Sequence, residues 1–337
     1  MQSAYIVSAK RSIVSPINGS LSSLPINELA APVINNAIEA SGINADAVDE
    51  LIVSNALGAG GNPARLIALS SNLPEKVAGL SIDRQCVGGL DAIMLGIKLV
   101  QSGSANVIVA GGVESYSNRP IRLAQAYDKI LVPYNTPEFT PNSNAEIHLA
   151  EAAYIIAEKF GFTQMDQDLF AINSHAKALD SKKSLSDEIV KIGPENFSFD
   201  PYARNLSLKL CGRAPKLFGS ITHANTAISA DAASFVVICK NVLKGEKALK
   251  LISGTTVGAN PKLPGLAPLD AIKGVFDVSG LKEKDINQVE IMEAYASQAM
   301  ACIAGSGLET VKTNPKGGAL ARGHPIGASG AILVTRL

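Results

Sequence analysis

One cysteine occupies a position where its side chain could act as a nucleophile. Cys86 lies in SIDRQCVGGLDAIMLG, residues 81–96, between a polar strand end and two glycines that precede an apolar run. A helix predicted over 91–103 would point its N-terminus at the sulfur, and the unpaired N–H groups there would favour the thiolate, which is the nucleophilic form. A free cysteine is also a common core residue, so this stretch alone leaves both interpretations open.

A histidine near the end of the chain is the second candidate. His324 lies in NPKGGALARGHPIGASGAILVTRL, residues 314–337, between Gly323 and Pro325. An imidazole titrates near neutral pH, so it could be a general base or a hydrogen-bond donor to an oxyanion. The glycines around it leave room for a thin extended ligand or for a close approach of backbone. The alternative is a buried histidine whose ring is satisfied by the backbone.

An internal repeat predicts that these two residues are neighbours. Residues 33–56 align without a gap with residues 271–294, at an offset of 238 residues, and the same offset places Cys86 on His324. Each aligned segment has the pattern of a helix, a Ser-Gly stop, a short polar link and a strand. Two halves related by a pseudo-twofold axis would bring equivalent strand–helix junctions together, so the cysteine and the histidine would meet there.

The elements that must position this pair alternate between strands and helices. The predicted strands cover 3–11, 50–57 and 105–112, and the predicted helices cover 26–42 and 91–103. This order is typical of a parallel α/β sheet covered on both faces. Glu114, which follows the third strand, is expected to be a buried polar anchor.

The chain then leaves the sheet and returns to it. A proline- and asparagine-rich stretch and two helical segments interrupt the alternation, and strand character returns at 230–240. We therefore predict a first half over 1–114, an inserted loop or lid domain over 115–220, a return to the first half over 221–245, and a second half over 246–337.

Composition excludes several classes of function. Apolar residues make up 47% of the 337 residues and charged residues 18%, which is typical of a folded globular protein. Lys+Arg and Asp+Glu both number 30, so no net charge draws the chain to nucleic acid or to an anionic membrane. No apolar run reaches the roughly 18 residues of a membrane span. The four cysteines have no paired spacing, so we expect reduced thiols, a cytoplasmic location and no metal site.

Three blocks together resemble the thiolases, which are acyl-CoA acetyltransferases. They are DRQCVGGLDAI, NVIVAGGVESYSNRP and GGALARGHPIGASGA, in the order and spacing of that family, and the resemblance covers essentially the whole chain. It implies a five-layered α-β-α-β-α fold of two duplicated halves, with a loop domain inserted in the first half.

The resemblance also implies a ping-pong transfer of a short acyl group. Cys86 would attack the acyl carbonyl of a coenzyme A thioester, and His324 would activate the sulfur. The acceptor would be coenzyme A or acetyl-CoA, and no further cofactor is implied. A homodimer or homotetramer is the implied assembly. The residues that match substrate-binding positions of the family are His148, Leu149, Arg213, Asn225, Ala294 and Tyr295.

Three departures from the family pattern leave alternatives open. Met292 stands where the family has an asparagine that holds a water near the acceptor thioester, and a thioether cannot donate a hydrogen bond. Ala227 stands where a serine is common. The sequence also ends at Leu337, before the second reactive cysteine of the family and before the repeat's counterpart of 105–115. An impaired paralogue that binds coenzyme A or a partner subunit, or another Cys/His condensing enzyme, is therefore an alternative.

Overall fold

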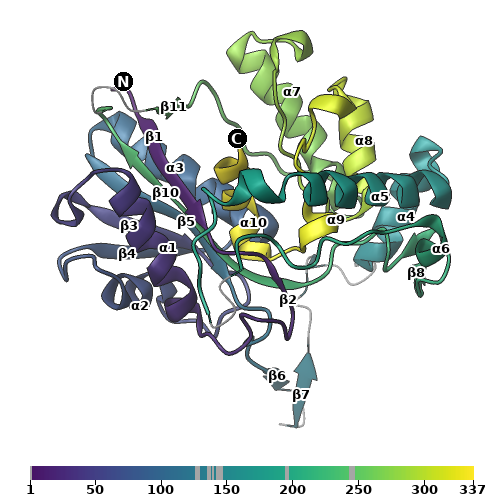
Figure 1. Ribbon diagram of the computed structural model, residues 1–337, viewed down its shortest axis with the longest axis horizontal. Helices are drawn as coiled ribbons and strands as arrows, with labels where there is room; N and C mark the ends of the chain where they lie inside the picture. Colours follow the sequence, from purple (N-terminus) through teal and green to yellow (C-terminus); the bar gives the residue numbers. More distant parts are fainter. Residues whose placement is uncertain are drawn as a thin grey trace.

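The structure is a computed structural model that describes residues 2–125, 130–134, 138, 140–141, 147–193, 197–242 and 247–337. The boundary expected between residues 245 and 246 lies outside the described residues. The chain is arranged around one large sheet, with helices on both of its faces (Figure 1).

That sheet has seven strands in the order β11-β1-β10-β5-β3-β4, with β2 paired to β10 off this path. Their bounds are Tyr5–Arg11 for β1, Ser15–Pro16 for β2, Glu50–Ser54 for β3, Ala78–Ile82 for β4, Val107–Glu114 for β5, Ala230–Cys239 for β10 and Leu249–Lys250 for β11. Every residue of β5 and β10 is buried, as expected for the apolar centre of a covered sheet.

The sheet is mixed, so the expectation of a parallel sheet is wrong. β3 pairs in parallel with β4 and β5, whereas β10 runs antiparallel to both β1 and β5. The chain leaves the sheet at Glu114 and returns at Ala230, and Glu114 pairs with Ala232, so both points lie at the same end of the strands. A strand that re-enters at the end where its neighbour finished must run in the opposite direction.

Two pairs of helices cover the two faces. Helices α1, Ile26–Ala40, and α2, Pro63–Ser70, pack on one face, and helices α3, Gly88–Ser102, and α10, Ile326–Arg336, pack on the other. The core therefore lies in two apolar layers, one between each helix pair and the sheet.

The helices of the two halves recur at the offset found in the sequence. α3 begins at Gly88 and α10 begins at Ile326, which are 238 residues apart. Helix α7, Ala267–Ser279, is the counterpart of α1, and helix α8, Ala296–Ser306, is the counterpart of α2; α7 packs on α8 as α1 packs on α2. This confirms the helical part of the predicted repeat.

The strand of that repeat is not formed in the second half. Residues 286–294 carry only single bridges, between Val289 and Thr313 and between Tyr295 and Thr226 at their edge, and no second large sheet is assigned among the described residues. These residues have no strand paired beside them among the residues that the structure describes. Strands need a hydrogen-bonded neighbour, which accounts for the difference.

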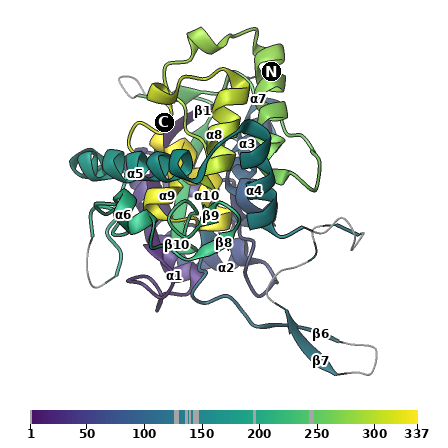
Figure 2. The same cartoon turned by 90° about the vertical axis from the view of Figure 1, so that its right-hand side faces the viewer.

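The excursion from the sheet forms a hairpin and several helices. Strands β6, Arg122–Gln125, and β7, Leu131–Tyr134, pair with each other and project away from the body (Figure 2). The remaining elements are α4, Leu149–Phe160, α5, Gln164–Asp180, α6, Leu208–Cys211, β8, Lys216–Phe218, and β9, Ile221–Thr222. α4 packs on α8, and α5 packs on α8 and on α9, Ala319–Arg322.

A fully buried arginine attaches the excursion to the sheet. The Arg11 guanidinium donates through Nη1 and Nη2 to the two carboxylate oxygens of Asp200, at 2.8 and 3.0 Å, and through Nε to Glu188 at 2.7 Å. Bidentate pairs of this kind fix direction as well as distance. The segment that contains both acids is therefore held against the end of β1.

Helices α3 and α10 approach so closely that glycine is required where they touch. A Cβ at Gly89 would lie 2.7 Å from the backbone nitrogen of Ala331, and a Cβ at Gly330 would lie 2.4 Å from the backbone nitrogen of Leu90. Real Cβ atoms do not approach backbone so closely, so any larger residue would force the helices apart.

We expect Gly330→Ala to lower the free energy of unfolding by about 1–3 kcal/mol through overpacking. Helix propensity alone would favour alanine by up to about 1 kcal/mol, so a net loss would isolate the cost of separating the helices. Urea unfolding measures the change. Gly258→Ala is the control, because a Cβ there meets nothing within 4 Å. Equal stability of the two variants would contradict the packing argument.

Candidate functional site

The Cys86 sulfur and the His324 ring meet in the structure. Sγ of Cys86 lies 3.0 Å from Nε2 of His324, within hydrogen-bond distance. The repeat offset predicted this proximity, and the geometry confirms it. Both side chains are partly buried, so a reactant could still reach the sulfur.

A strained turn presents Cys86 at the start of α3. The residue belongs to a short 3-10 turn, Gln85–Val87, which runs directly into the helix at Gly88. Gln85 has a φ of +49°, in the left-handed region that side chains disfavour, and its backbone N–H donates to Asp83 Oδ1 at 2.8 Å. Strained backbone of this kind is concentrated at functional sites, where it aims a side chain.

A glycine and two hydrogen bonds fix His324. Gly323 has a φ of +114°, which only glycine adopts readily, and the His324 backbone N–H donates to the carbonyl of Ile228 at 2.7 Å. The ring nitrogen Nδ1 lies 2.6 Å from Oγ of Ser329, which is 3% exposed. The imidazole is therefore held from both sides, with Nε2 left to face the sulfur.

Burial dominates the electrostatics of the pair. The pKa of Cys86 is raised to about 11, mainly by desolvation and to a smaller extent by the carboxylates of Glu114 and Asp83, against a lowering by a backbone hydrogen bond. Burial also lowers the pKa of His324 to about 4. The expectation that the helix terminus favours the thiolate at rest is therefore wrong, because desolvation outweighs the lowering by the backbone hydrogen bond. Both groups are neutral at neutral pH.

Tyr295 lies near the Cys86 sulfur, and Ala294 precedes it in the chain. Tyr295 bridges to Thr226, its ring packs in a cluster with Ala150, and the Ala294 carbonyl accepts from the Ala227 N–H at 2.9 Å. Burial and the nearby Cys86 sulfur raise the pKa of the Tyr295 hydroxyl to about 12, so it is a neutral neighbour of the sulfur.

The predicted residues at the start of α4 belong to the same region. His148 is exposed and caps α4, since its Nδ1 accepts from the Ala150 N–H at 3.3 Å. Leu149 follows with 42% of its surface exposed. Tyr295 packs against the cluster that contains Ala150, which links this helix start to the neighbour of Cys86.

Asn225 and Arg213 are placed differently. Both Nδ2 hydrogens of Asn225 are used, toward Asp168 at 3.0 Å and the Ser220 carbonyl at 3.2 Å, and the Asn225 backbone carbonyl accepts from the Ala296 N–H. Its amide therefore shapes the loop that meets α8 and has no donor left for a ligand. Arg213 is exposed just after α6.

Ser329 is the site residue that sequence reasoning missed. It lies in GASGA, whose glycines were expected to leave room beside His324, whereas residues 326–336 form helix α10. The available signal was its spacing, because a serine five residues after His324 reaches back to the ring once the segment is helical. Met292 lies partly buried between two buried residues.

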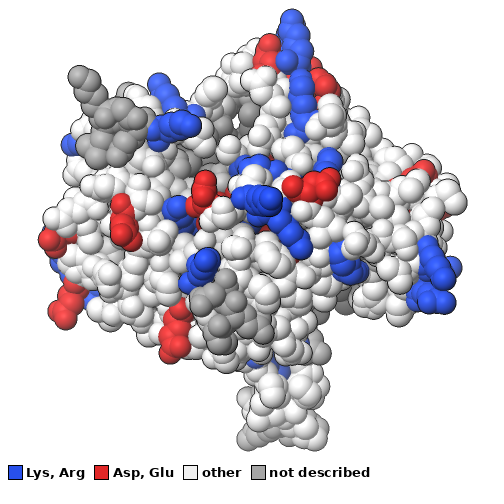
Figure 3. Space-filling model, viewed as in Figure 1, with Lys and Arg blue, Asp and Glu red and all other residues white. Residues whose placement is uncertain are grey.

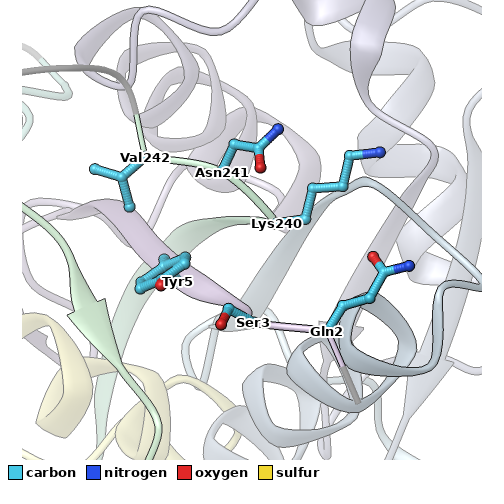
Figure 4. A pocket seen from close by; sticks show the side chains of 6 residues that line it. All are labelled: Gln2, Ser3, Tyr5, Lys240, Asn241 and Val242. Atoms are coloured by element: carbon cyan, nitrogen blue, oxygen red, sulfur yellow. The ribbon is translucent and has the colours of Figure 1, made fainter.

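The structure also has a separate cavity, and none of the predicted site residues lines it. It has a volume of about 710 Å³ and is lined by Gln2, Ser3, Tyr5, Lys240, Asn241 and Val242 (Figure 4). The Lys240 ammonium donates to Asn106 at 2.6 Å, so this charge already has a partner.

The described part of the chain holds no cluster of three metal-ligating side chains and no helix long and apolar enough to cross a membrane. Basic and acidic side chains are interspersed on the face shown in Figure 3.

Comparison with known proteins gives consistent matches along the chain. The family described as "Thiolase, N-terminal domain" matches residues 4–242, and "Thiolase, C-terminal domain" matches residues 246–337. An acetyl-CoA acetyltransferase of Cupriavidus necator is 34% identical over 363 residues, covering 100% of this chain and 92% of that protein. One of Allochromatium vinosum is 32% identical, with the same two coverages. The crystal structure of the Bacillus anthracis acetyl-CoA acetyltransferase has a TM-score of 0.91 at 29% identity, covering 100% of this chain and 91% of that one.

Iodoacetamide should label Cys86 before the other three cysteines, which are buried. Because burial raises the pKa of this thiol, the labelling rate should climb steadily from about pH 7 to about pH 10. Peptide mass spectrometry after short exposures measures both properties. A rate that is already maximal at neutral pH would indicate a preformed thiolate–imidazolium pair and contradict the neutral state.

Proposed function

Because the chain belongs to the thiolase family and is an acyl-CoA acyltransferase, we propose that Cys86 and His324 form its acyl-transfer centre. The observation that carries this proposal is the 3.0 Å contact between Sγ and Nε2 at the N-terminus of α3. The names of the relatives support acetyl as the transferred group. The matches contain nothing that favours a binding-only role.

The first half-reaction moves one proton and exchanges one thioester for another. Nε2 of His324 takes the proton from Sγ of Cys86 as the sulfur attacks the thioester carbonyl carbon. The bond from that carbon to the coenzyme A sulfur then breaks, and the leaving thiolate takes the proton from the imidazolium. The products are free coenzyme A and an acyl group on Cys86.

The second half-reaction transfers that acyl group to an acceptor. The thiol of coenzyme A can give up its proton to His324, attack the acyl-enzyme carbonyl and release the new thioester. In the synthetic direction His324 takes a proton from the methyl carbon of acetyl-CoA, the resulting enolate attacks the acyl-enzyme carbonyl, and the imidazolium returns that proton to the leaving sulfur of Cys86. In both directions Cys86 leaves as the thiolate and recovers its proton.

A neutral resting pair suits this sequence of steps. An imidazole with a pKa of about 4 is unprotonated at neutral pH, so its Nε2 is available as a base. With Nδ1–H donating to Ser329 Oγ, the ring holds the tautomer that leaves Nε2 free to accept from the thiol. The negative charge that appears during attack forms beside the N–H groups that open α3, which stabilise it.

We place the coenzyme A arm along the residues that connect the sulfur to α4. Tyr295 and Ala294 would line the acyl group, and His148 and Leu149 would meet the arm farther out, because both are exposed at the start of the helix. Arg213 is exposed on the same excursion and is suited to a phosphate. Asn225 would act by shaping the loop, since its amide donors are already used.

We further propose a cytoplasmic homodimer or homotetramer. β4 is the last strand on one side of the sheet and offers an edge to a second copy. The projecting hairpin exposes apolar side chains, namely Leu123, Leu131, Val132 and Tyr134, each at least 40% exposed. The described residues contain no disulfide bond, which fits a reducing compartment.

Incubation with radiolabelled acetyl-CoA should attach one acetyl group to the peptide that contains Cys86. Cys86→Ser should abolish the label, and His324→Ala should slow labelling by about 10²–10⁴-fold through loss of the base. Ser329→Ala should lower kcat by about tenfold, because the ring loses its orienting partner. Quenched-flow labelling and peptide mapping measure these rates.

Cys302→Ser is the matched control for these variants. Cys302 is buried on α8 and donates to the Gly265 carbonyl, and serine preserves that donor. Labelling of this variant should equal that of the wild type. Acetyl transfer that proceeds without any label on Cys86 would show that the proposed centre is wrong.

A further inference from the structure

Glu114 is a buried carboxylate that connects the two halves of the site. It is the last residue of β5, at the centre of the sheet, and only 1% of its surface is exposed. Burying a charge without partners is costly, so the groups around it indicate what it does.

Four donors surround this carboxylate. Oε2 accepts from the backbone N–H groups of Gly327 at 3.0 Å and Ala56 at 3.1 Å. Oε1 accepts from the Asn55 side-chain amide at 2.8 Å and from the Leu57 N–H at 3.1 Å. One side chain from the first half therefore holds both the loop after β3 and the start of α10.

The contact with Gly327 places Glu114 next to the reactive histidine. Gly327 lies three residues after His324 and two before Ser329, in the first turn of α10. A Cβ on residue 327 would lie only 3.0 Å from Glu114 Oε2. Glycine at this position therefore lets the carboxylate come close enough to bind the backbone of α10. Any shift of this turn would move the histidine and its serine partner together.

The charge of Glu114 also acts on the sulfur. The ionisable groups that face Cys86 are His324, Asp83, Glu114 and Tyr295, and the two acids both oppose ionisation of the thiol. Asp83 is exposed and therefore screened by solvent, whereas Glu114 is buried among backbone donors. Of the two acids, Glu114 therefore acts more strongly on the sulfur when it is ionised. Burial raises the pKa of Glu114 itself to about 7, so its charge is present mainly above neutral pH.

We propose that Glu114 is a positioning residue with two effects: it holds the first turn of α10 so that His324 meets Cys86, and when it is ionised its negative charge favours the protonated sulfur. The proposal rests on the proposed acyl-transfer role of the pair. It adds a residue that touches neither substrate nor reacting atoms but acts on both members of the pair.

Glu114→Gln separates this role from a merely structural one. Glutamine keeps the shape but turns an NH₂ group toward the N–H donors, so we expect kcat to fall by about 10–100-fold with little change in KM. Removal of the charge should also make Cys86 react with iodoacetamide about threefold or more faster at about pH 8, because the thiol ionises at lower pH. A structural change that merely opened the site would accelerate alkylation in Glu114→Asp as well, although that variant keeps the charge.

Two further variants make the result decisive. Glu114→Asp keeps the charge but shortens the reach, so kcat should fall while the alkylation profile stays at its wild-type position. Glu293→Gln is the matched control, since Glu293 is 2% exposed and accepts from Ser174, Asn314 and Leu320. It should lower thermal stability without moving the alkylation profile.

A Glu114→Gln enzyme with kcat within about twofold of the wild type would overturn the proposal, since misplacement of the pair costs far more. An alkylation profile that equals the wild type would overturn it as well. Alkylation needs no acyl transfer, so it tests Glu114 even if wild-type Cys86 takes up no acetyl group, a result that would count only against the proposed function.

Discussion

The close contact of α3 and α10 is the constraint on which the rest of the site depends. Each helix starts immediately after one member of the reactive pair, so the distance between the helix starts sets the distance from sulfur to imidazole. Glycine at 89 and 330 allows backbone to approach backbone there. The sheet beneath both helices and the duplicated connections around them keep α3 and α10 at this short distance.

Glu114 connects the position of helix α10 to the electrostatics around the Cys86 sulfur. The residues that order the first turn of α10 also determine the charge near the sulfur, so geometry and protonation are not independent here. The polar groups are arranged so that the buried carboxylate is fully hydrogen-bonded, which is the condition under which such a charge stabilises one arrangement of backbone. Low exposure of Cys86 and His324 then favours the uncharged form of each.

The sequence predicted the meeting of Cys86 and His324 because duplicated halves repeat at a fixed offset, and an offset survives even when few residues are identical. It also predicted most helices from apolar periodicity. The direction of β10 was not predictable, since it depends on where a long excursion returns. Helix α10 was missed because glycine and alanine give little periodic signal, and its stability comes from packing on α3.

The protonation of the pair required the structure as well. The sequence showed a helix N-terminus beside a cysteine, which favours a thiolate, but the desolvation that outweighs it comes from residues far away in the chain. Asn225 illustrates the same limit from another side. Its type matched a binding position, and only its neighbours show that both amide hydrogens are already used.

The turn at Gln85 and the high thiol pKa have a consequence for how the protein survives between catalytic cycles. Peroxides attack thiolates and convert them step by step to sulfenic and sulfinic acids, the second of which is generally irreversible. A sulfur that stays protonated at rest offers these oxidants little to react with. Cys86 is therefore oriented for attack on a bound thioester, yet it reacts slowly with peroxides while its sulfur remains protonated.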